Sequence, residues 1–94
     1  MVQDGEYEWD ARKALANLSK HGVPFEAVLG FQWNDALILR DERRDYGEPR
    51  FLAYGLIDER LHALVFTPRK GRIRVISLRK ANSREVRRWL EAGR

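Results

Sequence analysis

Apolar residues first recur at helical spacing near the start of the chain, and this pattern predicts a helix over residues 11–21. Asp10 is suited to cap the start of this helix, and Gly22 is suited to end it. A second, shorter helix is expected over residues 24–29, because a proline opens this segment and Gly30 follows it. The residues that would form the buried face of the first helix are Ala11, Ala14, Leu15 and Leu18.

The rest of the chain shows short apolar or alternating runs separated by turn residues, which is the pattern of strands. Because tight turns join the later runs, we expect antiparallel neighbours. After Asn82 or Ser83, either of which can cap a helix, apolar residues return to helical spacing. The predicted fold is therefore α+β, with two N-terminal helices, a four-stranded antiparallel sheet and a C-terminal helix in the order ααββββα. The predicted strands are residues 36–39, 50–57, 61–67 and 72–79.

Length and composition indicate a single domain over residues 1–94, with a hydrophobic fraction of 44%. The chain has no cysteine, and no apolar run approaches the roughly 20 residues that span a bilayer. The acidic N-terminal segment lacks the apolar stretch of a signal peptide. We therefore expect a soluble, cytoplasmic protein without disulfides and without membrane contact.

The net charge of +4 is unevenly distributed along the chain. Residues 68–94 contain ten basic and two acidic residues, whereas residues 1–67 contain eight basic and twelve acidic ones. A basic C-terminal third favours a polyanionic partner, either nucleic acid or an acidic protein surface. A well-solvated arginine-rich surface explains the same composition, and charge alone does not decide between the two.

The last predicted strand carries most of the candidate chemistry. Strict alternation places Arg72 and Arg74 on one face of this strand and Ser77 and Arg79 on the other. Guanidinium groups bind phosphate in a bidentate manner, so these arginines suit a nucleic-acid backbone. The alternative is that they are solvent-facing charges that guard the edge of a sheet.

Other kinds of catalytic site find little support in the sequence. The only histidines, His21 and His62, lack the spacing of metal ligands, and there is no glycine-rich phosphate loop, GxSxG motif or cysteine nucleophile. We therefore expect neither a metal nor a cofactor. His21, in the last turn of the first helix, is suited either to cap carbonyl groups or to transfer protons near neutral pH.

Several motifs occur together, in order and at compact spacing. The pattern W-D-x(6)-N-x-x-K-H-G-V begins at Trp9, and Y-G-E-P-R-F begins at Tyr46. F-T-P-R follows from Phe66, and R-I-R-V-I-S-L-R-K-A follows from Arg72. Together these motifs resemble those of the BrnT toxins of bacterial type II toxin–antitoxin systems over nearly the whole chain. Two residues depart from the family pattern without loss of a basic side chain, namely Leu78 and Trp89.

The resemblance implies a RelE-like fold, metal-independent RNA cleavage that arrests translation, and a cognate ribbon-helix-helix antitoxin of the BrnA type that contacts operator DNA. Such cleavage uses the 2′-hydroxyl of the RNA as nucleophile, and it requires proton-transfer groups and cations around the phosphate. The expected catalytic residues are Lys20, His21, Glu48, Arg50, Arg74 and Arg79. The expected RNA-binding residues are Thr67, Arg69, Arg72, Ser77 and Lys80.

Two other functions fit the same residues. A non-catalytic nucleic-acid-binding module would use the same basic strand, bind with strong salt dependence and leave RNA uncut. A protein-interaction module would use the basic surface to dock an acidic partner.

Overall fold

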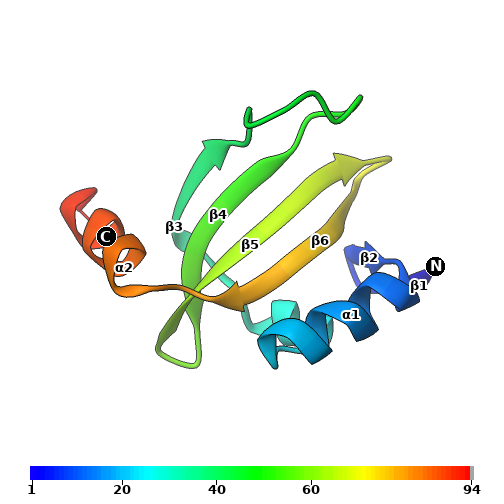
Figure 1. Cartoon of the computed structure of the whole chain (residues 1–94), viewed down its shortest axis with the longest axis horizontal. Helices are drawn as coiled ribbons and strands as arrows, with labels where there is room; N and C mark the ends of the chain where they lie inside the picture. The colour runs from blue at the N-terminus through cyan, green and yellow to red at the C-terminus, as the bar shows by residue number, and fades with distance from the viewer. Residues whose placement is uncertain (94) are drawn as a thin grey trace.

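The computed structural model describes residues 1–93 and contains one six-stranded mixed sheet (Figure 1). The strands lie side by side in the order β1-β2-β6-β5-β4-β3, and all neighbours are antiparallel except β2 and β6, which are parallel. The strands are β1 (Val2–Asp4), β2 (Tyr7–Trp9), β3 (Gln32–Arg40), β4 (Phe51–Ile57), β5 (Arg60–Arg69) and β6 (Arg72–Lys80). The helices are α1 (Ala11–His21), the 3₁₀ helix η1 (Phe25–Gly30) and α2 (Ser83–Glu91).

The fold is α+β, but the predicted order ααββββα is wrong. The four predicted strands lie within β3 to β6, whereas the hairpin of β1 and β2 was not expected. The strand β2 has only three residues, too few for a recognisable alternation, and its partner β6 is remote in sequence. The second predicted helix is a 3₁₀ helix, whose i to i+3 hydrogen bonds suit short segments.

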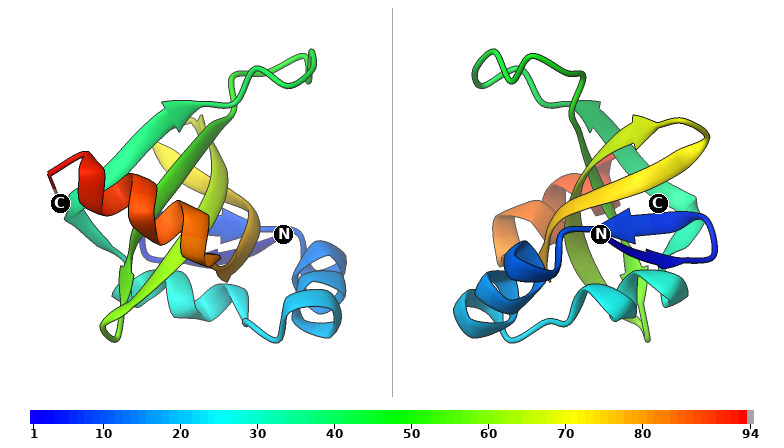
Figure 2. Two further views of the ribbon diagram at one scale, coloured as in Figure 1. Left: turned by 60° about the vertical axis from the view of Figure 1, so that its left-hand side comes forward. Right: turned by 90° about the vertical axis from the view of Figure 1, so that its right-hand side faces the viewer.

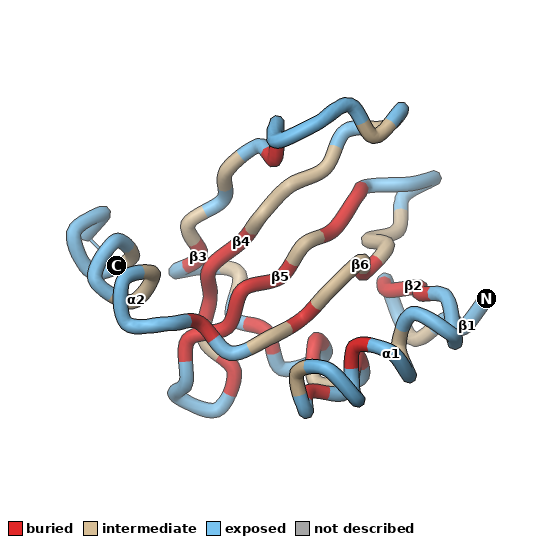
Figure 3. Tube along the Cα trace, viewed as in Figure 1, coloured by how far each residue is buried: buried red, intermediate tan, exposed pale blue. Residues whose placement is uncertain are grey.

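Helices cover both faces of the sheet and produce two hydrophobic cores (Figure 2). On one face, α1 and η1 pack over a core that includes the fully buried Phe25, Val28 and Leu64. On the other face, α2 packs against β3, β4 and β5, with Val86 and Trp89 as its contact residues. Burial is therefore greatest along β5 and the adjoining part of β4 (Figure 3).

The apolar stripe of α1 does not face the core as expected. Leu15 and Leu18 are 69% and 43% exposed, whereas Asn17 is only 7% exposed. The Asn17 side-chain amide donates to the Leu78 carbonyl at 2.7 Å and accepts from the Leu78 backbone N–H at 3.2 Å. It also donates to the carbonyl of Val23. The strand β2 pairs only with the start of β6, so the backbone groups further along this edge of β6 have no strand partner. The Asn17 carboxamide takes the place of that partner at Leu78.

Candidate active site

A bulge in β6 brings the arginines of this strand to one face. Val65 of β5 is paired with Ser77, but the next residue, Phe66, is paired with Val75, so Ile76 is an extra residue on β6. The predicted strict alternation is therefore wrong. One inserted residue reverses the phase of the strand, so that Arg74, on one side of the bulge, and Arg79, on the other, point to the same face.

This face is the one on which α2 packs, and the helix leaves part of it uncovered. Arg79 is paired in register with Ala63, which belongs to the core beneath α2. Towards the other end of the sheet, Ser77 is paired with Val65, and Arg74 with Thr67, and neither pair belongs to either core cluster. The polar residues of β6 thus extend from the start of α2 across the exposed part of the sheet.

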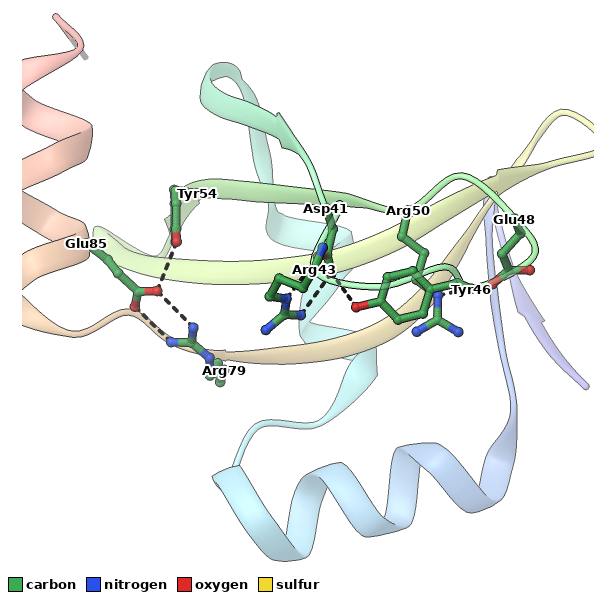
Figure 4. Close-up of polar contacts among 8 residues, drawn as sticks. All are labelled: Asp41, Arg43, Tyr46, Glu48, Arg50, Tyr54, Arg79 and Glu85. Atoms are coloured by element: carbon green, nitrogen blue, oxygen red, sulfur yellow. Dashed lines mark hydrogen bonds and ion pairs between the residues drawn. The ribbon is translucent and has the colours of Figure 1, made fainter.

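Arg79 is held by a carboxylate from α2 (Figure 4). Its guanidinium group donates to both carboxylate oxygens of Glu85 at 2.8 Å, and the Tyr54 hydroxyl donates to Glu85 at 3.0 Å. The same carboxylate accepts from the backbone N–H of Asn82, the residue that caps α2. The pKa of Glu85 is lowered to about 2, mainly by the hydrogen bonds from Arg79. Glu85 therefore fixes both the start of α2 and the orientation of Arg79.

A second carboxylate, that of the buried Asp41, organises the loop between β3 and β4. Asp41 accepts two side-chain hydrogen bonds from Arg43 at 2.9 Å and one from the Tyr46 hydroxyl at 3.2 Å (Figure 4). The bonds from Arg43 lower the pKa of Asp41 to about 2. Because the Asp41 backbone N–H also donates to the Arg50 carbonyl, this residue joins both ends of the loop.

A groove of about 520 Å³ lies between this loop and the start of α2. Leu39, Leu52 and Tyr54 line it from the sheet, and Glu42, Asp41 and Glu85 add carboxylates. The positive charges that line it are Arg40, Arg43, Arg79 and Arg88. Guanidinium groups from a loop, a strand and a helix therefore converge on one depression that can take a phosphate group.

The other arginines of this face are also paired. Arg74 donates to Glu8, with a shortest distance of 2.7 Å, across the parallel pairing of β2 and β6. Arg50 forms an ion pair with Glu48 at 3.2 Å, and its guanidinium lies 4.1 Å from the centre of the Tyr46 ring. The pairing between β2 and β6 thus supplies the carboxylate that positions Arg74.

Lys20 and His21 lie at the edge of the sheet next to the bulge. Together with Ser77, Ile76 and Asn17 they line a depression of about 240 Å³. Burial lowers the pKa of His21, and the nearby positive charges of Lys20 and Arg79 lower it further. His21 is therefore neutral at physiological pH and able to accept a proton.

Glu48, Arg50 and Arg74 line neither of these two depressions, and four further predicted residues also lie outside them. Thr67 is buried, and its hydroxyl donates to the Pro49 carbonyl at 2.6 Å, so it holds the end of the loop. Lys80 is paired with His62 and lines a cavity on the opposite face. At the far end of the β5–β6 hairpin lie Arg69, which is exposed, and Arg72, which donates to the Gly5 carbonyl.

One family model matches this chain, and it covers residues 9–85. The model describes the ribonuclease toxin, BrnT, of type II toxin–antitoxin systems. The chain belongs to the BrnT family. No curated protein matches the sequence at a significant level. A BrnT toxin acts on RNA and has an antitoxin as its partner, and the matched span contains most of the candidate site, from Lys20 to Glu85.

The described part of this BrnT chain shows neither a metal-binding cluster nor a membrane-spanning helix. Residues 1–93 contain no cluster of three or more histidine, cysteine, aspartate or glutamate side chains that could hold a metal ion. No helix within the same residues has the length and apolar character needed to cross a bilayer.

Several site residues were missed by sequence analysis of this BrnT chain. Arg43 and Asp41 lie in a loop whose turn residues gave no sign that it folds back beside the sheet. Glu85 fits the sequence signature of a capping box with Asn82, but this signature predicts a helix start rather than a bond to Arg79. Other missed residues are Glu8, Arg40, Glu42, Tyr54 and Arg88.

Proposed function

We propose that this BrnT-family chain is a metal-independent endoribonuclease that binds its substrate across the uncovered face of the sheet. The observation that carries the proposal is the bulge at Ile76, which turns Arg79 towards the groove that Arg43 and Arg88 also line. With Arg40, four guanidinium groups line this groove, and they suit a phosphate that gains charge in the transition state. Family membership supports RNA as the substrate.

In the proposed reaction, the 2′-oxygen of the RNA attacks the adjacent phosphorus. A base removes the proton of the 2′-hydroxyl, the bond from phosphorus to the 5′-oxygen breaks, and an acid returns a proton to that oxygen. The products are a 2′,3′-cyclic phosphate and a 5′-hydroxyl. All the atoms come from the RNA, and the protein lends only protons and charge.

His21 suits the role of base because its lowered pKa leaves it neutral at physiological pH, and it lies beside Ser77. Lys20, in the same depression, is suited to donate the proton to the leaving oxygen. Glu48 remains an alternative proton-transfer group, although its carboxylate is paired with Arg50. Arg79 and Arg43 stabilise the charge on the phosphate.

The remaining basic residues of this face bind the neighbouring nucleotides. Arg74, Arg50 and Ser77 contact the RNA backbone on the sheet, and Arg69 and Arg72 extend the positive surface along the hairpin. Lys80 is left out of the site because it lies on the other face. The function of Thr67 is to anchor the loop.

The family context extends the proposal to partners and cellular role. RNA cleavage by this chain arrests translation in the cytoplasm, and a ribbon-helix-helix antitoxin of the BrnA type neutralises it. The same antitoxin brings the complex to operator DNA. The motif that begins at Trp9 and the family match over residues 9–85 support this assignment.

The test compares native protein with Arg79→Ala on purified RNA in the presence of EDTA. Removal of one transition-state cation costs a factor of roughly 10² to 10³ in rate. Arg60→Ala is the matched control, because Arg60 is an exposed arginine that lines a cavity on the other face of the sheet. RNA cut by the native chain and by Arg60→Ala, but spared by Arg79→Ala, supports the proposal.

Other outcomes point to the alternative functions. RNA that stays intact while the chain binds it with strong salt dependence indicates a non-catalytic binding module. Cleavage that stops in EDTA contradicts metal independence. Growth arrest after induction in bacteria, without cuts in cellular RNA, also contradicts the nuclease assignment.

A further inference from the structure

Tyr46 lies outside both hydrophobic cores, in the loop between β3 and β4. Its ring lies against two guanidinium groups, those of Arg50 at 4.1 Å and Arg44 at 5.2 Å from the ring centre. Its side chain is partly exposed, and its hydroxyl donates to the buried Asp41 (Figure 4). The loop thus presents an aromatic ring that core packing does not explain.

The ring is held in a fixed position. Asp41, which accepts its hydroxyl, also accepts two bonds from Arg43 and closes the loop at Arg50. A ring fixed at its hydroxyl end loses little further freedom when another planar group packs on it, which favours binding.

A depression of about 300 Å³ opens beside this ring. Arg44, Tyr46 and Arg50 line it, and it shares Arg40, Asp41 and Glu42 with the groove that contains Arg79. An RNA strand with one phosphate at Arg79 would therefore carry a neighbouring nucleotide to Tyr46.

We propose that the ring of Tyr46 is a stacking platform for a nucleobase next to the scissile phosphate. This inference rests on the proposed RNA substrate. Single-stranded RNA is commonly bound by bases stacked on aromatic rings and on the planes of arginine side chains. Both kinds of surface meet at Tyr46.

Arg44 would make room for the base. It is exposed, and among residues 1–93 it forms no ion pair, so only the Tyr46 ring holds its guanidinium in place. A base that occupies this side of the ring releases Arg44 to pair with the adjacent phosphate. Arg50, held by Glu48, remains against the ring.

The test measures the affinity for a fluorescent ten-nucleotide RNA with 2′-O-methyl groups, which the protein cannot cut. Tyr46→Leu removes the ring, and Tyr46→Phe keeps the ring but loses the bond to Asp41. Because stacking of one base contributes a factor of roughly 5 to 100 in affinity, Tyr46→Leu should weaken binding by that factor. Tyr46→Phe keeps the stacking surface and loses only the bond that fixes it, so it should weaken binding clearly less than Tyr46→Leu does. Thermal melting confirms that both variants fold.

An RNA with one abasic site, moved stepwise along the strand, tests the contact from the other side. At one position the abasic site should weaken binding to the native chain by the same factor, yet cause no further loss with Tyr46→Leu. An equal loss of affinity in Tyr46→Phe and Tyr46→Leu would overturn the platform. So would abasic sites that weaken binding to Tyr46→Leu as much as to the native chain at every position, or a native chain that does not bind this RNA. The binding experiment uses an RNA that cannot be cut, so its result does not depend on catalysis. If the chain binds this RNA through Tyr46 but does not cleave ordinary RNA, the proposed nuclease function is wrong and the stacking platform still stands.

Discussion

Single carboxylates hold the arginines of the candidate site in place. Charge-assisted, bidentate bonds orient a guanidinium group before any substrate arrives, so less rotational freedom is lost when a phosphate binds. The phosphate uses the donor groups that remain free. The carboxylate–arginine pairs on this face are Glu8–Arg74, Asp41–Arg43, Glu48–Arg50 and Glu85–Arg79.

His21 gives a prediction at the level of one residue. Burial and two neighbouring positive charges lower its pKa below the usual 6.5, so it is charged only in acid. If His21 is the base, the rate of RNA cleavage should rise with pH through that lowered pKa and level off near neutral pH. A pH–rate profile of the native chain provides the measurement.

His21→Gln should remove the acidic limb of this profile and lower the rate at neutral pH by roughly 10²-fold or more. His62→Gln is the control, since His62 lies on the other face and should leave the limb in place. An acidic limb that persists in His21→Gln assigns the proton transfer to another group.

At the level of elements, one residue in β6 determines which side chains reach the site. Val75 and Leu78 are three positions apart, yet both point into the core beneath α1 and η1. Only the extra residue at the bulge makes this possible, and it also carries Arg79 to the face that Arg74 shares. The core and the site therefore depend on the same irregularity.

The contact between α1 and the edge of β6 gives a prediction about stability. Asn17→Ala should lower the free energy of unfolding by about 2 to 3 kcal/mol, because it leaves buried backbone groups of Leu78 and Val23 without a partner. Leu15→Ala should cost less than about 1 kcal/mol, because Leu15 is largely exposed. Urea denaturation of both variants measures the difference. A larger loss in Leu15→Ala would mean that α1 packs through its leucines.

At the level of the whole molecule, the sheet separates two surfaces with different roles. One face is covered by α1 and η1, and the other is partly covered by α2 (Figure 2). The groove of arginines lies beside the start of α2. The basic C-terminal third supplies both β6 and α2, and it contributes two of the four arginines that line the groove, Arg79 and Arg88. This separation decides which basic residues can reach the groove, and it excludes Lys80, which lies on the other face.

The two carboxylates with lowered pKa values predict how the whole fold responds to acid. The pKa values of Asp41 and Glu85 are lowered to about 2, from ordinary values of 3.8 and 4.5. Because the unfolded chain then binds these protons more readily, their stabilising effect is complete above about pH 4.5 and is lost as the pH falls towards 2. The free energy of unfolding should therefore decrease over this window.

Glu85→Gln should reduce the slope of stability against pH between about 4.5 and 2, as measured by urea denaturation at a series of pH values. Glu91→Gln is the control, since Glu91 is an exposed residue of the same helix. An identical slope in the native chain and in Glu85→Gln would show that the Arg79 contact does not contribute to acid stability.

Local signals in the sequence determined much of this protein. Asp10 caps α1 through the backbone N–H groups of Arg12 and Lys13, and Gly22 ends this helix with a φ of 72°, which suits glycine. The strands β3 to β6 and the family motifs were visible for the same reason, because turns, caps and apolar periodicity depend on adjacent residues. Arg79 and His21 were chosen as candidate residues, but their roles stay predictions.

Tertiary contacts decided the rest. The pairing of Glu8 with Arg74, the bulge at Ile76 and the outward turn of the α1 leucines all depend on residues far apart in sequence. A three-residue strand carries too little pattern to reveal its partner, and a bulge is defined only by the register of the neighbouring strand. The sequence therefore contains the arginines and carboxylates of the site, but only the packed sheet determines which of them meet.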